Sequence, residues 1–411
     1  MKDFSLSRRG FLKGAAAAAG AAAGTRFAGR ELIGSARAAG TNQPALLVIH
    51  LNGGFNSLFV SADSLVGKFG VTAGNFTKVG AGGAGPGIDN TWANSMSPFV
   101  KNHIATIGVR HGISSHDAAR TADWTYQNRN SGLILANALG GTGSIKAAIV
   151  GAGTPLGPKP PEGGVTLQSI NDMKTTIDAL GGGAKNPRIP DREITAGAIT
   201  DSEKMSAGRL KDSPVGLTSL REGYGATIDT LKQPVKPFSF PDLAAAYGLN
   251  ANATNVNTFA AKMAAAELMI TAGSNVVIAI DNGWDTHGDT NGNTVRNKMT
   301  SYVMPALNAF MNRMIVDDTL AANSALPGFN RNVAVCIFGD FARSLPGSDH
   351  QPNMSAAVMG KFVKSGTTGR TDANVGLAAG TPSTAGWWAY LAAITKAPGT
   401  PFGANPHNLV L

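Results

Sequence analysis

Two short apolar runs, each ended abruptly by glycine and a polar side chain, constrain the fold most. Residues 45–51 read Ala-Leu-Leu-Val-Ile-His-Leu and stop at Asn52-Gly53-Gly54, and residues 333–338 read Val-Ala-Val-Cys-Ile-Phe and stop at Gly339-Asp340. An apolar run of this length without polar alternation is typical of a strand buried on both faces, as strands of parallel sheets are. The sequence therefore predicts an α/β fold around buried strands.

The rest of the chain predicts what surrounds these strands. Further strands are expected at residues 104–109 and 275–280, and helices at 115–128, 259–272, 300–314 and 386–396. Strands that alternate with helices indicate a mainly parallel sheet covered by helices on both faces. Residues from about 151 to 240 are rich in Gly, Pro and polar side chains and break this alternation. We expect an insertion or cap there, within a single domain of residues 39–411.

The N-terminus has the pattern of a removed export signal. Paired arginines in Ser7-Arg8-Arg9-Gly10-Phe11-Leu12-Lys13 precede a weakly apolar, alanine-rich run, and Ala36-Arg37-Ala38 fits a signal-peptidase site. An ordinary amphipathic helix would need a polar face, which residues 15–23 lack. We therefore expect residues 1–38 to be a signal peptide that engages the twin-arginine export machinery, and the mature chain to be periplasmic or extracellular.

Charge and composition exclude several classes of protein. The signal region carries +5 of the formal charge of +9 and leaves 28 basic and 24 acidic residues. No basic cluster with interleaved aromatic residues remains, so we expect no nucleic-acid binding. After residue 38 no apolar segment reaches the ~20 residues that a membrane span needs, so no transmembrane span is expected in the mature chain. The single Cys336 cannot form an internal disulfide, so stability must come from packing or a metal.

Histidines and aspartates gather where the predicted strands end. Ligands of open α/β sheets bind outside the carboxyl ends of the strands. Five of the seven histidines lie in or beside four such segments: His50, His111, His116, His287 and His350. Asp285 with His287, and Asp349 with His350, form two Asp/His pairs whose oxygen and imidazole donors suit zinc, iron or manganese. Each pair also has an ordinary interpretation, since Asp285 could cap a turn and His287 could simply lie on the surface.

Other residues near the strand ends are open to two interpretations. Asp340 is either a metal ligand or a helix cap, and Arg343 either contacts an anionic substrate or forms a structural ion pair. Ser115 lies at an expected helix N-terminus, where the dipole suits a nucleophile or anion site, although plain N-capping explains it equally well. His116 and Asp117 do not complete a catalytic triad with Ser115, because adjacent residues on a helix point in different directions.

Five segments, in their order along the chain, resemble motifs of the exported bacterial "domain of unknown function 1501" family, which belongs to the alkaline-phosphatase and sulfatase superfamily. These segments are Gly53-Gly54-Phe55-Asn56-Ser57, Ser115-His116-Asp117-Ala118, Gly283-Trp284-Asp285-Thr286-His287, Phe338-Gly339-Asp340-Phe341-Ala342-Arg343 and Gly347-Ser348-Asp349-His350-Gln351. The resemblance covers roughly residues 45–395, and its Trp-Asp-Thr-His element is the most specific. Asn56 stands where the family has Asp, and Asp340 where it has Glu.

The resemblance implies an alkaline-phosphatase-like fold and a divalent metal cofactor, with zinc expected first and manganese or iron as alternatives. In that superfamily a Ser or Thr attacks the phosphorus or sulfur of an ester while metals stabilise the charged oxygens. Ser115 and His116 are then the expected catalytic residues, and Arg343 and Asn56 the expected contacts of an anionic ester substrate. The implied metal ligands are the Asp and His side chains of the matching segments: Asp285, His287, Asp340, Asp349 and His350.

Three functions stay open at this point. The first is a metal-dependent hydrolase of phosphate or sulfate esters. The second is a non-catalytic scaffold or binding protein of the cell envelope with a degenerate metal site, which Asn56 and Asp340 favour. The third is a metal-dependent redox enzyme, which only the export route suggests.

Overall fold

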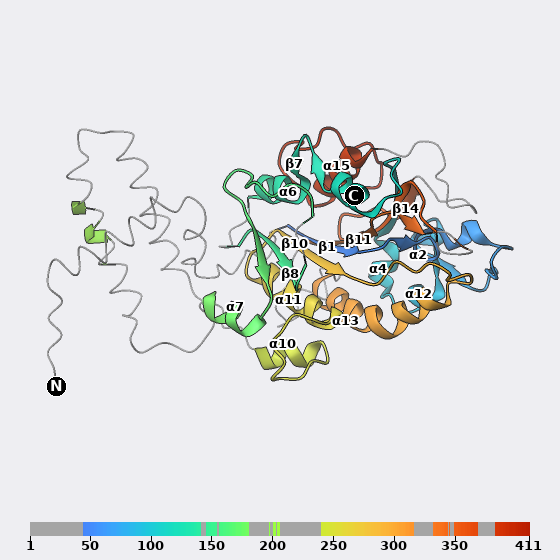
Figure 1. The fold of residues 1–411 in the computed structure, drawn as a ribbon, viewed down its shortest axis with the longest axis horizontal. Helices are drawn as coiled ribbons and strands as arrows, with labels where there is room; N and C mark the ends of the chain where they lie inside the picture. Colours follow the sequence, from blue (N-terminus) through green and yellow to red (C-terminus); the bar gives the residue numbers. More distant parts are fainter. Residues whose placement is uncertain are drawn as a thin grey trace. The chain divides into compact units, whose positions relative to one another are not determined.

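An eight-stranded sheet forms the centre of the fold in the computed structural model (Figure 1), in the order β14-β5-β13-β11-β1-β10-β8-β9. Every neighbouring pair is parallel except those of β13, which runs antiparallel to both β11 and β5. The fold is therefore mixed α/β with a mostly parallel sheet, as the sequence predicts. Its strands are β1 (Ala45–Leu51), β5 (Ile104–Arg110), β8 (Ala147–Val150), β9 (Leu167–Ile170), β10 (Val276–Asp281), β11 (Val333–Gly339), β13 (Asn353–Gly360) and β14 (Gly366–Thr368).

The structure describes most of the chain after residue 43. The described residues are 44–140, 145–153, 156–180, 197, 200–202, 204–205, 240–315, 332–343, 345, 349–368 and 383–411. The chain divides into two units, one of residues 1–38 and 177–238 and the other of residues 39–176 and 239–411. The predicted signal peptide lies outside the described residues, as does most of the predicted insertion. The sheet belongs to the second unit.

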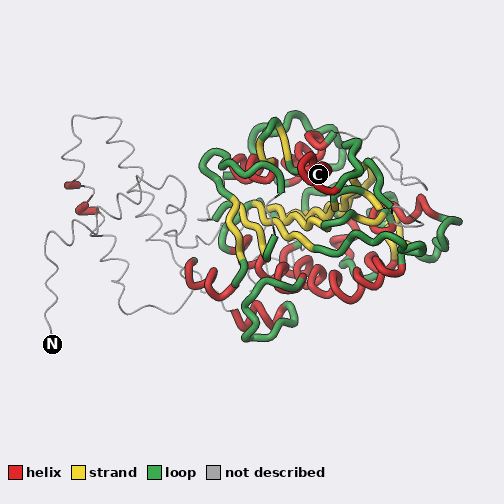
Figure 2. The backbone as a smooth tube through the Cα atoms, in the orientation of Figure 1, coloured by secondary structure: helices red, strands yellow, loops and turns green. Residues whose placement is uncertain are grey.

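Helices lie on both faces of the sheet (Figures 1 and 2). Leu46 and Val48 of β1 belong to a buried cluster that includes α6 (Ser131–Leu139) and α15 (Thr384–Ile394). On the opposite face run α11 (Phe259–Thr271) and α13 (Met304–Met314). Because every residue of β1 is buried, the strand needs apolar side chains on both faces, which explains the unbroken run in its sequence.

The remaining helices are shorter and flank the sheet or its loops. A π-helical turn, η3 (Met299–Val303), joins α12 (Asn293–Lys298) to α13, so the helix expected at 300–314 begins seven residues earlier. The others are α2 (Leu58–Ser61), α3 (Asn90–Ala93), α4 (Pro98–Asn102), α5 (His116–Asp123), α7 (Met173–Ala179) and α10 (Phe240–Ala246), with the 3₁₀ turns η1 (Ala62–Leu65) and η2 (Ala81–Gly83). Within the described residues, none of the helices combines the length and apolarity that crossing a bilayer demands.

The helix predicted over residues 115–128 is too long. It ends at Asp123, because Gln127 and Asn128 both adopt positive φ and turn the chain into a two-residue hairpin. Two central residues with positive φ are typical of a type I′ turn, whose twist matches the flanking strands. The hairpin pairs β6 (Thr125–Tyr126) with β7 (Arg129–Asn130); β3 (Phe76–Lys78) pairs with β4 (Gly87–Asp89), and β2 (Phe55–Asn56) with β12 (Ala342–Arg343).

Candidate metal centre

The sheet brings five segments to one edge. β1, β5, β10 and β11 share one direction, so the loops that follow them leave the sheet at the same edge. β13 runs the other way, and its first residue Asn353 pairs with Arg110 at the end of β5. The loop that precedes β13 therefore returns to this edge as well. The carboxyl ends of parallel strands are where α/β proteins bind ligands.

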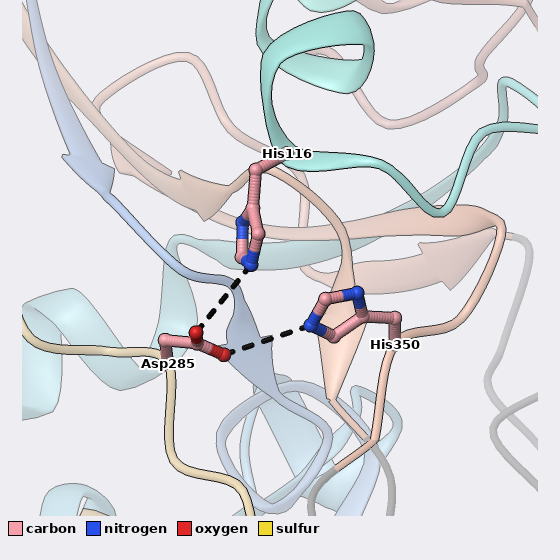
Figure 3. A group of neighbouring side chains, drawn as sticks. All are labelled: His116, Asp285 and His350. Atoms are coloured by element: carbon pink, nitrogen blue, oxygen red, sulfur yellow. Dashed lines mark ion pairs between the residues drawn. The ribbon is translucent and has the colours of Figure 1, made fainter.

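Three side chains from separate loops converge at this edge (Figure 3). His116 begins α5, Asp285 follows β10, and His350 precedes β13. One ligand atom from each lies within 4.8 Å of the others. The Oδ2 of Asp285 is 3.6 Å from the Nε2 of His116, and its Oδ1 is 3.6 Å from the Nε2 of His350. Two imidazoles and one carboxylate form a metal-ligand set of a kind that zinc sites use.

A fourth side chain, His287, extends the cluster. Its Nε2 lies 2.9 Å from the Nε2 of His350 and 3.1 Å from the Oδ1 of Asp285. In a tetrahedral site with metal bonds of 2.0–2.1 Å, ligand atoms stand about 3.3 Å apart. The distances from Asp285 to the three histidines, and from His287 to His350, lie between 2.9 and 3.6 Å, near that value. His116, Asp285 and His350 form the candidate metal-binding group, with one ligand atom of each within 4.8 Å of the others, and His287 lies beside it.

The cluster is open to solvent. The exposed fractions of its side chains are 27% for His116, 48% for Asp285, 53% for His287 and 21% for His350. Structural metal sites are closed by four protein ligands, whereas catalytic sites keep a position for water or substrate. This degree of exposure leaves room for an exogenous ligand beside the side chains.

Asp340, a predicted ligand, lies behind His116 instead of among the grouped ligand atoms. The carboxylate is fully buried; its Oδ2 is 2.6 Å from the Nδ1 of His116, and its Oδ1 is 2.8 Å from the Nε2 of His50. The backbone N–H of Gly53 also donates to Oδ2 at 3.2 Å. Burial alone would raise the pKa of Asp340, but the hydrogen bonds with His50 and His116 and the charges of His50 and Arg120 bring it below its ordinary value. A carboxylate on Nδ1 turns the Nε2 of His116 toward the cluster, an arrangement common in metal sites.

His350 is oriented in the same way by a backbone group. Its Nδ1 lies 2.9 Å from the carbonyl oxygen of Ser114, which leaves Nε2 facing the cluster. Asp349, the other predicted ligand of this loop, accepts a hydrogen bond from the backbone N–H of His350 at 2.7 Å. Asp349 therefore shapes the loop and is not one of the grouped ligand residues.

Arg343 forms an ion pair inside the site. Its side chain is buried, its Nε donates to the carbonyl oxygen of Gly53 at 2.5 Å, and its guanidinium pairs with the Oδ1 of Asp285. Burial would raise the pKa of Asp285, but Arg343, with His116 and His287, lowers it. Of the two interpretations that the sequence leaves open, the structure places Arg343 in the ion pair, where it fixes the carboxylate of a ligand.

Two predicted site residues, Ser115 and Asn56, are not among the grouped ligand residues. Ser115 is exposed at the N-terminal boundary of α5, and its hydroxyl makes no capping hydrogen bond. Asn56 is buried; its Oδ1 accepts from the backbone N–H of Leu58 at 3.1 Å, and its Nδ2 has no partner among the described residues. Ser115 is thus accessible and adjacent to a ligand, whereas Asn56 is closed to a substrate.

Sequence reasoning gave no role to three residues of this region. His50 supports Asp340, Arg120 reaches the loop after β1, and Asp123 is a buried acid at the end of α5. The sequence does carry a signal for His50: a histidine inside an apolar strand is expected to be buried, and a buried imidazole needs a polar partner. Arg120 lies four residues after His116, so the helical repeat puts the two on one face. His111 stays outside the cluster, and burial lowers its pKa to about 4.

Asp123 lies two turns after His116 on the inward face of α5. Both of its carboxyl oxygens lack a hydrogen-bond partner among the described residues. Burial, and secondly the charge of Asp340, raise the pKa of Asp123 well above its ordinary value. The Nδ1 of His50 also lacks a partner among the described residues, and the His50 ring lies 6.1 Å between centroids from that of Trp124, the residue after Asp123. The carboxyl group of Asp123 therefore keeps its proton to a higher pH than an exposed aspartate does.

Comparisons with known proteins do not indicate which chemistry takes place at this edge of the sheet. No protein-family model matches the chain, and no curated protein does. The solved structure of the PH0037 protein from Pyrococcus horikoshii is similar at 12% sequence identity, with a TM-score of 0.33, over 88% of this chain and 100% of that chain.

Proposed function

We propose that the protein is a metal-dependent hydrolase of phosphate or sulfate esters, with zinc as the first candidate for its ion and manganese or iron as alternatives. The observation that carries the proposal is the open cluster of His116, Asp285 and His350, with His287 beside it. The resemblance of the loop motifs to the alkaline-phosphatase-like "domain of unknown function 1501" proteins supports the reaction class. Export by the twin-arginine route, which places the activity outside the cytoplasm, is part of the same proposal.

The chain's own residues divide the work at this site. His116, Asp285 and His350 would hold the ion, while Asp340 and the carbonyl of Ser114 keep both imidazoles turned toward it. When bound, a divalent ion supplies a Lewis acid for the ester oxygen and an acidified water. The exposed hydroxyl of Ser115, which makes no capping hydrogen bond and is next to His116 in the sequence, is the nucleophile that we propose.

Metal content tests the site first. Mature protein of residues 39–411, exported natively, is expected to contain stoichiometric zinc, manganese or iron, and the Asp285→Ala/His287→Ala variant is expected to lose it, because two of the four donor side chains disappear. The matched control is Asp242→Ala/His103→Ala, which removes the same residue types at positions outside the cluster. Elemental analysis of all three proteins is the measurement. Protein without metal in the wild type would refute the proposal.

Ester cleavage tests the reaction. Metal-loaded protein is expected to hydrolyse aryl phosphates or aryl sulfates, and Ser115→Ala is expected to lower the rate at least 100-fold while its metal content stays unchanged. Turnover that is unaffected by Ser115→Ala would assign the attack to water.

A second candidate function is a non-catalytic, metal-binding scaffold of the cell envelope. The observation that favours it is Asn56, which is buried and bonded within its own turn where the similar family has an acid. Metal binding without cleavage of either ester, together with envelope partners that remain bound to the Asp285→Ala/His287→Ala variant, would favour the scaffold over the hydrolase.

A further inference from the structure

We propose that Arg120 is the anion-binding residue of this site and recognises a tetrahedral oxyanion, the phosphate or sulfate group of a substrate held at the metal cluster. The inference rests on the proposed function, because the oxyanion is expected to lie between the ion and the guanidinium. It assigns to Arg120 the role that the sequence led us to expect of Arg343.

The first argument is the position of Arg120. It lies on α5 four residues after the ligand His116, so the two Cβ atoms are about 5–6 Å apart on one helix face. The NH1 of Arg120 donates to the Oδ1 of Asn52, in the loop after β1, at 2.6 Å. The Nδ2 of Asn52 in turn donates to the Oδ1 of Asn282 at 2.8 Å, three residues before Asp285. Arg120 is thus tied to the loops that carry the cluster.

The second argument is that neighbouring cations are committed elsewhere. Arg343 is buried against Gly53 and Asp285. Lys298 donates to the carbonyl oxygens of Asn282 and Gly283 at 2.6 and 2.9 Å and lies over the ring of Trp284. Both of these cations hold the loop after β10 in place, and exchanging their partners for a substrate would release that loop.

The third argument is the kind of partner that Arg120 has. The carboxylate that pairs directly with Arg120 is that of Asp117, whose side chain is 94% exposed, while Arg120 itself is 23% exposed. An ion pair so open to water contributes little and exchanges readily. The charge of Arg120 also acts on the buried carboxylate of Asp340. The neutral amide of Asn52 orients the guanidinium without cancelling its charge. A guanidinium offers a planar fork of N–H donors that suits two oxygens of a phosphate or sulfate.

The test uses zinc-loaded mature protein, with inorganic phosphate and sulfate as probes in calorimetric titrations. We expect Arg120→Gln to retain stoichiometric zinc and to weaken oxyanion binding roughly 10- to 100-fold, the usual effect of losing a charge-assisted hydrogen-bond pair. The oxyanion affinity of Arg120→Lys should lie between those of wild type and Arg120→Gln, because an ammonium group keeps the positive charge but lacks the planar pair of N–H donors. Arg129→Gln is the matched control, since Arg129 also pairs with a surface carboxylate, Glu162, at 2.8 Å.

A kinetic experiment separates recognition of the anion from damage to the site. Arg120→Gln is expected to raise KM for an aryl phosphate with a smaller change in kcat, because the guanidinium binds the oxyanion and does not hold the metal. Equal oxyanion affinity in Arg120→Gln and wild type, or zinc-loaded wild type that binds no oxyanion, would overturn the assignment of Arg120 while the metal centre stands. Wild type that binds no zinc, manganese or iron would refute the metal centre and the oxyanion site together.

Discussion

Asp340 sets the orientation of a candidate metal ligand without joining the ligand set. Its two oxygens are divided between His116 and His50, and the backbone N–H of Gly53 completes its contacts. A carboxylate in this position fixes the tautomer of the ligating imidazole and increases its basicity. From the end of β11, the short aspartate side chain reaches two histidines.

We therefore expect Asp340→Asn to weaken zinc binding about 10- to 100-fold, the usual effect of changing the carboxylate behind a ligating histidine. Competition with a chromogenic chelator measures the affinity. Asp289→Asn is the control, since Asp289 is also a buried carboxylate and, among the described residues, accepts from the backbone N–H groups of Thr294 and Val295 instead of from histidines. Equal zinc affinity in Asp340→Asn and wild type would remove Asp340 from the metal centre.

At the scale of elements, a glycine pair lets the loop after β1 pass between two other loops. Gly53 and Gly54 have φ values of 121° and 120°. A Cβ on Gly53 would lie 2.2 Å from the backbone nitrogen of Asp285, and one on Gly54 would lie 2.8 Å from the Nε of Arg343. The loops after β1, β10 and β11 can approach this closely only because neither position has a side chain.

Gly53→Ala is therefore expected to be much more destabilising than an ordinary glycine substitution. Its matched control is Gly288→Ala, which has a φ of 82° but nothing within 4 Å of the added Cβ. Backbone strain alone costs of order 1–3 kcal/mol. Gly288→Ala should therefore lose only that amount of stability, whereas Gly53→Ala should lose more because its added Cβ also clashes with the backbone of Asp285. Urea titration measures both free energies of unfolding. Similar decreases in the free energy of unfolding of the two variants would show that the loops shift to accommodate the added Cβ of Gly53→Ala.

The sequence predicted these elements unevenly, for physical reasons. Apolar runs such as residues 45–51 identify buried strands, because burial on both faces excludes polar alternation. The hairpin after Asp123 went unpredicted, since its turn uses Gln127 and Asn128 and no glycine. β13 also went unpredicted, because its Asn-Met-Ser-Ala-Ala-Val-Met-Gly sequence has one β-branched residue. Because β13 runs antiparallel to β5, its first residues, just after His350, lie beside the end of β5, just before His116. Since β13 was not predicted, the sequence could place His350 near His116 only through the rule that ligands bind at the carboxyl ends of strands.

At the scale of the whole molecule, one buried acid couples folding stability to pH. Asp123 has a pKa well above its ordinary value because it is buried near Asp340. Above about pH 4 the unfolded chain releases this proton while the folded chain keeps it. The unfolded state then binds fewer protons, so stability falls as pH rises until the pH passes the pKa of the folded state.

Asp123→Asn removes this dependence with a side chain of similar size. At neutral pH, the free energy of unfolding of the variant is expected to exceed that of the wild type. The difference should shrink by up to ~1.4 kcal/mol for each pH unit toward pH 4. Urea titrations at pH 4.5, 6 and 7.5 measure it, with Asp178→Asn, an exposed aspartate of α7, as the control. A difference that does not change with pH would mean that Asp123 is ionised in the folded protein.

The three converging side chains come from positions 116, 285 and 350, and so from three distant parts of the chain. An ion bound by all three would act as a reversible cross-link, in a protein whose single cysteine cannot supply a covalent one. Because the unfolded chain does not hold these groups together, free metal at 1,000 times its dissociation constant would add about 4 kcal/mol to the free energy of unfolding. The same ion would then contribute both to the stability of the fold and to the chemistry of the site.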